Sequence, residues 1–255
     1  MLPENFKLAD YLQRIAYSGE VKADYATLKQ LMACQLQNVP FENLDVLAGK
    51  PISLDPQTIV EKIVYRRRGG YCYEVNGLFA MALGSIGFPY RIVACRPLFY
   101  PVRRPRTHAA LVVTAEGQDY LVDLGFGSYG IRQPMNLAVL DTPVQQDYDR
   151  YQLTIAADGD YVLSALVEGE WIKQHGFNLT PMEWLDFMPA NWFNSTHPDA
   201  VFTQKPLILL FTPTGKRVLF GDSFKQTEQG KTTVQSVSPE QQADILAEYF
   251  HLKFS

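Results

Sequence analysis

The chain passes from one helical segment to the next at Arg67-Arg-Gly-Gly-Tyr-Cys-Tyr-Glu-Val-Asn76. Upstream, Asp55-Pro56 is a typical helix start, and apolar residues recur at helical spacing until the arginines. The paired glycines break that helix, and Cys72 opens a second apolar-periodic segment that ends near Gly84. The stretch therefore predicts a cysteine at the N-terminus of a helix.

A cysteine in this position has surroundings that favour a thiolate. The helix dipole, the free N–H groups of the first turn and the nearby arginines all stabilise negative charge. Such surroundings lower a cysteine pKa from about 8.5 to between about 3.5 and 7.5. The alternative is a small apolar side chain that packs at a helix start, and this stretch alone leaves both open. Cys34, within a helix, and Cys95, within a strand, are expected to be buried structural thiols.

A nucleophilic cysteine needs a base, and the base needs an orienting group. The chain has four histidines, of which His251 lies in the terminal helix and His197 precedes a proline. Both positions are typical of structural or exposed side chains. His108 lies in one strand of an expected hairpin and Asp123 in the other, so these two are the candidate base and orienter.

The relative placement of His108 and Asp123 follows from counting along the hairpin. With a four-residue loop at 115–118, Thr114 pairs with Asp119, and Asp123 faces a residue two positions from His108. Because side chains alternate, both then lie on one face with Cα atoms roughly 7–8 Å apart. An odd loop length would separate them. On spacing alone, an ordinary cross-strand polar pair remains the alternative.

Motifs spread along the whole chain match those of one known family. Besides Arg67–Asn76, they are Pro40-Phe-Glu-Asn-Leu-Asp45, Arg106-Thr-His108, Tyr120-Leu-Val-Asp-Leu-Gly-Phe-Gly127 and Asn194-Ser-Thr-His-Pro198. With these motifs the chain resembles the arylamine N-acetyltransferases, as a bacterial-type member.

The resemblance implies an α+β fold with a papain-like cysteine catalytic core. It implies an N-terminal helical bundle at residues 1–87 that carries the nucleophile. A central β-barrel at 88–187 would carry the histidine and aspartate, and a C-terminal α/β lid would occupy 188–255. The change from helical periodicity to short strands after Tyr90 agrees with this layout.

The resemblance also implies a Cys72–His108–Asp123 triad and a ping-pong reaction. Acetyl-coenzyme A would acetylate Cys72, and an arylamine, arylhydroxylamine or hydrazine would then take the acetyl group. Acetyl-coenzyme A is a co-substrate, and no permanent cofactor or metal is expected. Val75 departs from the glutamine or histidine common at its position, and with the triad intact we expect little effect.

Four further residues are carried over from the family. Thr107 and Gly127 are expected to contact the acetyl donor, and Phe41 and Phe126 to line the acceptor pocket, although core aromatics are the alternative. The loop Gly125-Phe-Gly-Ser-Tyr-Gly130 fits the dinucleotide motif G-x-G-x-x-G, but no βαβ unit surrounds it. Its bare N–H groups would instead suit the pyrophosphate of coenzyme A.

Two basic segments offer weaker signals. Arg103, Arg104 and Arg106 precede the candidate base, and a phosphate contact with coenzyme A competes with a solvated loop. Thr212-Pro-Thr-Gly-Lys216 lacks the first glycine of a phosphate-binding P-loop, so a hairpin turn is expected there.

Composition narrows the class of protein. The 255 residues suit two or three small domains, and a net charge of −4 argues against a nucleic-acid partner. The longest strongly apolar run, 207–211, is too short to span a membrane, and the N-terminus has no secretory signal pattern. Three cysteines favour reduced thiols in the cytoplasm. The sequence does not give the oligomeric state.

Other functions remain open at this stage. An amide synthase of the same family would use a large carrier-bound acyl chain. A thiol hydrolase or transglutaminase-like enzyme with the same triad would act on amide bonds. A non-catalytic binding module would show no thiol reactivity at Cys72.

Overall fold

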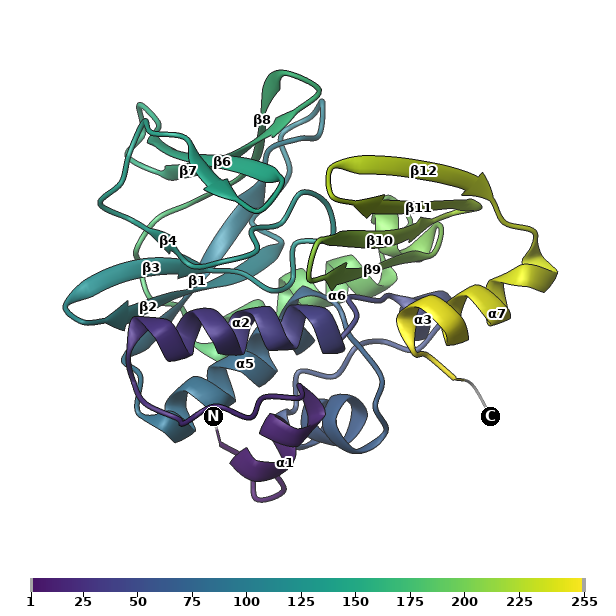
Figure 1. The fold of residues 1–255 in the computed structure, drawn as a ribbon, viewed down its shortest axis with the longest axis horizontal. Helices are drawn as coiled ribbons and strands as arrows, with labels where there is room; N and C mark the ends of the chain where they lie inside the picture. The colour runs from purple at the N-terminus through teal and green to yellow at the C-terminus, as the bar shows by residue number, and fades with distance from the viewer. Residues whose placement is uncertain (1, 254–255) are drawn as a thin grey trace.

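The computed structural model describes residues 2–253, in which five α-helices precede the two β-sheets, α6 lies between the sheets in the chain and α7 follows the second sheet (Figure 1). The α-helices are α1 (Leu8–Arg14), α2 (Tyr25–Asn38), α3 (Leu44–Leu47), α4 (Pro56–Val60), α5 (Cys72–Ile86), α6 (Met188–Thr196) and α7 (Pro239–Phe250). A π-helical turn, η1 (Glu61–Tyr65), and two 3₁₀ turns, η2 (Trp184–Phe187) and η3 (Val201–Thr203), join them. The strands are β1 (Tyr90–Pro97), β2 (His108–Ala115), β3 (Gln118–Val122), β4 (Met135–Asn136), β5 (Val144–Gln146), β6 (Asp149–Ile155), β7 (Tyr161–Val167), β8 (Glu170–Phe177), β9 (Leu207–Thr212), β10 (Gly215–Phe220), β11 (Ser223–Glu228) and β12 (Lys231–Ser236).

Local sequence signals set the helix ends. The Asp55 carboxylate accepts the Thr58 N–H at 2.9 Å and caps α4, which continues through η1. Helix α5 begins at Cys72, as predicted, and ends at Gly87, whose φ of 99° is in the left-handed region that glycine adopts readily. Its apolar side chains are buried, so the nucleophile candidate stands on a rigid core helix.

The larger sheet has eight strands in the order β4-β3-β2-β1-β8-β7-β6-β5. It curls strongly, with α2 and α5 along one side of β1–β3 (Figure 1). The mixed helix-and-sheet class is confirmed. The expected barrel takes the form of a curled sheet with β4 and β5 at its edges.

The β2–β3 hairpin has the predicted register. Thr114 pairs with Asp119, and Glu116-Gly117 form the two-residue turn with φ of 51° and 75°. Two central residues with positive φ are typical of the type I′ turn that suits a twisted hairpin. Because the residue count of the loop is even, His108 and Asp123 fall on one face, as the counting required.

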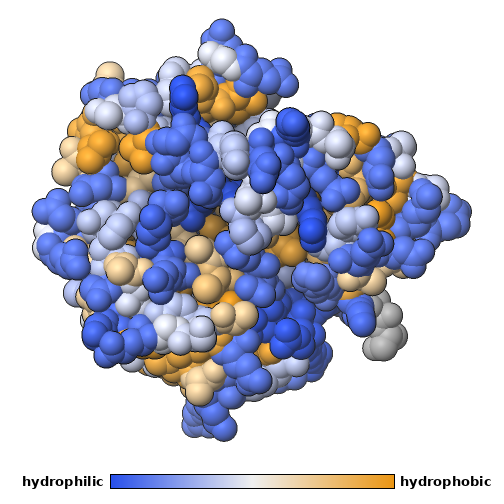
Figure 2. All heavy atoms as spheres, viewed as in Figure 1, coloured by the Kyte–Doolittle hydropathy of each residue, from blue (hydrophilic) through white to orange (hydrophobic). Residues whose placement is uncertain are grey.

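The C-terminal part forms a second sheet, ordered β12-β11-β10-β9, beside the first (Figure 1). Its first strand is tied to the N-terminal region because Phe41 and Leu209 exchange two backbone hydrogen bonds of 2.8 and 2.9 Å. Strands β11 and β12 and helix α6 were not predicted from the sequence. The face shown in Figure 2 is mostly hydrophilic with smaller apolar patches. Among residues 2–253, no helix is long and apolar enough to cross a membrane.

Candidate active site

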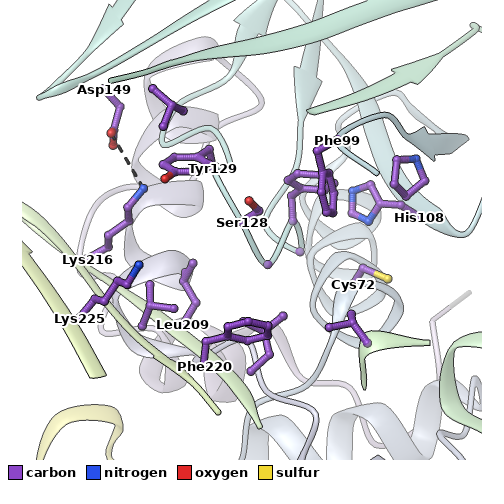
Figure 3. A pocket seen from close by; sticks show the side chains of 18 of the residues that line it. Cys72, Phe99, His108, Ser128, Tyr129, Asp149, Leu209, Lys216, Phe220 and Lys225 are labelled. Carbon is purple, nitrogen blue, oxygen red and sulfur yellow. Dashed lines mark ion pairs between the residues drawn. The ribbon is translucent and has the colours of Figure 1, made fainter. Parts of the chain in front are cut away.

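A cavity of about 860 Å³ lies where the start of α5 meets both sheets. Cys72 and His108 lie together at one end, and Lys216 and Lys225 extend from the opposite wall (Figure 3). The loop 125–129 forms the floor between them, and Phe126, Gly127 and Tyr129 all line the space. The cavity therefore connects the reactive-cysteine candidate with a basic wall.

Close backbone packing fixes Cys72 at the cavity. A Cβ atom on Gly125 would lie 2.5 Å from the Cys72 Cα, so only glycine permits this approach between loop and helix. The Tyr71 N–H donates to the Glu74 carboxylate at 3.0 Å and satisfies a free donor at the helix start. Cys72 itself is 2% exposed yet lines the cavity.

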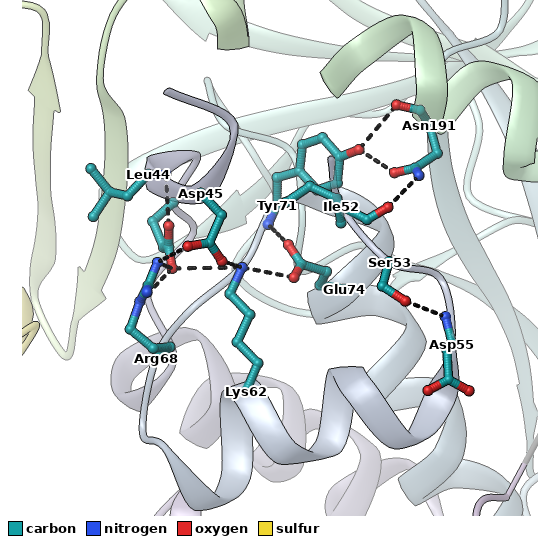
Figure 4. A network of polar contacts seen from close by, with 11 residues as sticks. Leu44, Asp45, Ile52, Ser53, Asp55, Lys62, Arg68, Tyr71, Glu74 and Asn191 are labelled. Atoms are coloured by element: carbon teal, nitrogen blue, oxygen red, sulfur yellow. Dashed lines mark hydrogen bonds and ion pairs between the residues drawn. The ribbon is translucent and has the colours of Figure 1, made fainter. Parts of the chain in front are cut away.

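A largely buried salt-bridge cluster lies behind this helix start (Figure 4). We call it the support cluster, and its members are Glu42, Asp45, Lys62, Arg68 and Glu74. The Lys62 ammonium lies 2.8 Å from carboxylate oxygens of both Asp45 and Glu74, and Arg68 donates to Glu42 at 2.8 Å. Burial raises the pKa of Glu74 to about 7, although Lys62 opposes the shift. The cluster links residues 42–45 to the segment that carries Cys72.

His108 and Asp123 form a short, buried pair. The His108 Nε2 lies 2.6 Å from Asp123 Oδ2, and the two side chains are 5% and 1% exposed. Burial lowers the pKa of His108, but the Asp123 charge and hydrogen bond, with Cys72, raise it to about 10. For Asp123, burial raises the pKa and the two neighbouring histidines lower it, with a net shift well below its usual range. Asp123 is thus an anion that supports a protonated His108.

Three further groups surround Asp123, and two of their side chains were missed from the sequence. Asp123 Oδ1 accepts the Gly125 N–H at 3.0 Å and the Asn76 amide at 3.1 Å. The His175 Nε2 lies 3.2 Å from Asp123 Oδ2. Asn76 stands one helical turn after Cys72, a spacing that could have indicated it. No local signal indicates His175.

The structure brings most of the remaining predicted residues to the cavity. Thr107, Gly127 and Phe126 line it. Phe41 is buried and packs directly behind Gly127: a Cβ atom added to Gly127 would lie 2.8 Å from the Phe41 ring. The Thr107 carbonyl accepts hydrogen bonds from the Tyr73 hydroxyl and the Asn194 amide, which fixes the strand entry beside His108.

The basic residues near the cavity differ in whether an acidic side chain already pairs with them. Arg104 lines the cavity, whereas Arg106 is paired with Asp160 at 2.6 Å. The Lys216 side chain is mostly buried, with its Nζ 4.5 Å from the Tyr129 ring centroid and 4.0 Å from Asp149 Oδ1. Within residues 2–253 its ammonium makes no hydrogen bond, and burial lowers its pKa. A buried cation with open donors is suited to an incoming anion.

Comparison with known proteins gives one consistent match. The family model described as N-acetyltransferase matches residues 24–255. The chain is 36% identical over 234 residues to an arylamine N-acetyltransferase of Mycolicibacterium smegmatis, covering 88% of this chain and 84% of that protein.

Solved structures of the same kind of enzyme resemble this chain over nearly its whole length. An arylamine N-acetyltransferase from M. tuberculosis superposes with a TM-score of 0.91 at 32% identity, covering 96% of this chain and 93% of that chain. A Mycobacterium marinum arylamine N-acetyltransferase in complex with CoA superposes with a TM-score of 0.90 at 31% identity, covering 96% and 92%.

Proposed function

The chain belongs to the arylamine N-acetyltransferase family, and we propose that it moves an acetyl group from acetyl-coenzyme A to an aromatic amine through a thioester on Cys72. One observation carries the proposal: the buried His108–Asp123 pair lies beside Cys72 at the end of a cavity whose far wall is basic. The same proposal interprets the chain as a papain-like core divided at about residues 87 and 187 into helical, sheet and lid domains.

The first half-reaction acetylates the cysteine. Because Nε2 of His108 is engaged by Asp123, Nδ1 is left to exchange a proton with Cys72. The Cys72 thiolate attacks the thioester carbonyl and forms a new C–S bond. The C–S bond to coenzyme A then breaks, and protonated His108 gives its proton to the departing sulfur. Backbone N–H groups at Cys72 and Tyr73 are the candidates for stabilising the oxyanion.

The second half-reaction transfers the acetyl group. An arylamine is weakly basic, so its nitrogen lone pair is free at neutral pH and can attack the Cys72 thioester. Neutral His108 takes a proton from that nitrogen, and the C–S bond to Cys72 breaks. Asp123 holds the imidazole in the required tautomer through both steps. The thiolate–imidazolium pair is then restored.

The basic wall supports coenzyme A as the donor. Lys216 and Lys225 would meet its phosphates, and Arg104 would add a third cation. Thr107 and Gly127 line the same cavity and would contact the pantetheine arm on its way to Cys72. The CoA complex of the M. marinum relative supports the same ligand class.

Aromatic side chains near His108 support an aromatic acceptor. Phe126 and Phe99 meet edge to face with centroids 5.8 Å apart, and both line the cavity next to the base. A flat apolar amine or hydrazine would stack there with its nitrogen toward the thioester. Phe41 would act only through Gly127, since it lies behind the wall.

Intact mass after exposure to acetyl-coenzyme A tests the proposal. Wild type should gain one acetyl group and lose it when an arylamine is added, whereas Cys72→Ser should gain none. A rapidly quenched wild-type sample without added mass would overturn acetyl-coenzyme A as donor. Acylation by a carrier-bound long chain instead would identify an amide synthase, and cleavage of amide substrates a thiol hydrolase.

A further inference from the structure

His175 is a buried titratable group that the reaction described above does not use. It lies on β8 and is fully buried. Strand β1 separates β8 from β2, and Cys95 of β1 pairs with His108 on one side and with Phe177 on the other. His175 is two residues from Phe177 on an alternating strand, so it shares the face of His108. Its ring centroid lies 5.3 Å from that of His108.

The surroundings of His175 leave one polar partner. Its ring packs against Phe126 at 5.0 Å and Phe177 at 5.9 Å between centroids. Neither ring nitrogen makes a well-aligned hydrogen bond to any of residues 2–253, and Nε2 lies 3.2 Å from Asp123 Oδ2. An unpaired buried imidazole is costly, so this contact needs a donor on Nε2.

We propose that His175 is a positioning residue of the active site: its neutral imidazole donates an Nε2–H to Asp123 and holds the carboxylate against His108. The effect of His175 on catalysis rests on the proposed function, in which Cys72, His108 and Asp123 carry out acetyl transfer. It deepens that function because the nucleophile and the base both depend on the orientation of Asp123.

Counting lone pairs shows why a fourth donor matters. An ionised carboxylate can accept about four hydrogen bonds. Asn76 and Gly125 donate to Oδ1, and His108 donates to Oδ2. The Nε2 of His175, 3.2 Å from Oδ2, is the candidate for the fourth position. Without it, Asp123 can rotate away from the line of the His108 Nε2–H.

The protonation state fits this role. Burial lowers the pKa of His175, Asp123 opposes this shift, and the neighbouring His108 lowers the pKa further. The titratable groups that shift the pKa of His175 are Asp123 and His108, and on the neighbouring strand β1 burial raises the pKa of the Cys95 thiol. Only His108 of the two imidazoles is therefore expected to carry the proton that balances Asp123.

A matched pair of variants tests the inference. His175→Phe keeps an aromatic ring against Phe126 and Phe177 but removes both nitrogens, and His175→Gln restores an N–H donor. The readout is the pH profile of Cys72 alkylation by iodoacetamide, followed by peptide mass, which requires no acetyl donor. We expect His175→Phe to lower the neutral-pH rate about tenfold and move the profile to higher pH, and His175→Gln to stay near wild type.

The outcomes separate the inference from the proposed function. A folded His175→Phe protein with the wild-type profile would overturn the positioning role, as would equal loss in both variants without a change in profile. Failure of acetyl transfer in wild type would instead refute the donor and leave the alkylation result standing. Should His175→Phe not fold, the tautomer in ¹⁵N-histidine-labelled wild type decides: Nε2–H supports the inference, and Nδ1–H contradicts it.

Discussion

Two buried charged clusters flank the start of α5, and they differ in what their charges face. The support cluster, from Glu42 to Glu74, lies behind the helix and contributes no residue to the cavity wall (Figure 4). The cluster of Cys72, His108 and Asp123, with His175, which we propose to be catalytic and call the catalytic cluster, lies in front, and Cys72 and His108 open into the cavity. Both use short ion pairs, yet only one can exchange a proton with a ligand.

The comparison shows that burial of charge is not by itself a sign of catalysis. In the support cluster, Lys62 meets three carboxylates, and its ammonium therefore stays charged. In the catalytic cluster, His108 depends on one carboxylate, and its other nitrogen is available to Cys72. We expect changes behind the helix to alter stability and changes in front of it to alter rate.

The largest effect should come from Asp123→Asn. The amide would stabilise the wrong tautomer of His108 and remove its counter-charge, so kcat should fall about 10⁴-fold with the fold retained. Steady-state acetylation of an arylamine measures this. Asp119→Asn is the control, since that carboxylate belongs to β3, which ends one residue before Asp123, but pairs with Arg91 at 2.6 Å. Equal losses in both variants would contradict a catalytic role for Asp123.

Lys62→Met should destabilise the protein while sparing the chemistry. It leaves the buried carboxylate of Glu74 without its cation, whereas Glu42 keeps Arg68, and breaking such a buried pair costs about 3–5 kcal/mol. Urea unfolding measures the loss, and kcat/KM per folded molecule should change little. Lys22→Met, at an exposed pair with Glu20, is the control. A large fall in kcat at full folding would remove the distinction between the clusters.

Glu74 should make stability depend on pH. Its pKa is about 7 in the folded protein and 4.5 in the unfolded chain, so the folded state holds the extra proton between these values. The free energy of unfolding should therefore fall as pH rises from 4.5 to 7, by up to about 1.4 kcal/mol per unit. Subtracting the Glu74→Gln curve from wild type isolates this slope. Glu20→Gln should leave it intact, and a flat difference would contradict the assignment.

The features that could be predicted from the sequence are those set by neighbouring residues, such as the register of a hairpin and the start of a helix. The β2–β3 hairpin places Asp123 on the face of His108 because one short turn sets the register. Helix α5 could be predicted to begin at Cys72 from the glycines before it. The support cluster was not predicted, since its members come from separate segments and exposed ion pairs use the same residue types.

The missed features depend on contacts between distant residues. His175 reaches Asp123 only because β1 pairs with β8, which places Cys95 opposite Phe177, and no turn sets that register. Strand β12 is exposed along its whole length, so it lacks the apolar alternation that indicates a strand. Phe126 and Phe41 illustrate the same limit: both are apolar and match family motifs, but packing puts only Phe126 at the cavity.

Replacing Lys216 should have the smallest effect, yet it best separates a ligand-binding charge from a structural one. Lys216 has a buried ammonium without the carboxylate partners that Lys62 has. Burial without a hydrogen bond costs free energy, so Lys216→Met should leave stability unchanged or raise it by about 1 kcal/mol. Loss of a charged hydrogen bond to a phosphate should raise the KM for acetyl-coenzyme A about tenfold with kcat unchanged. Lys231→Met, on exposed β12, is the matched control. A destabilised Lys216→Met protein with normal KM would place Lys216 with the support cluster instead, as a charge kept for folding.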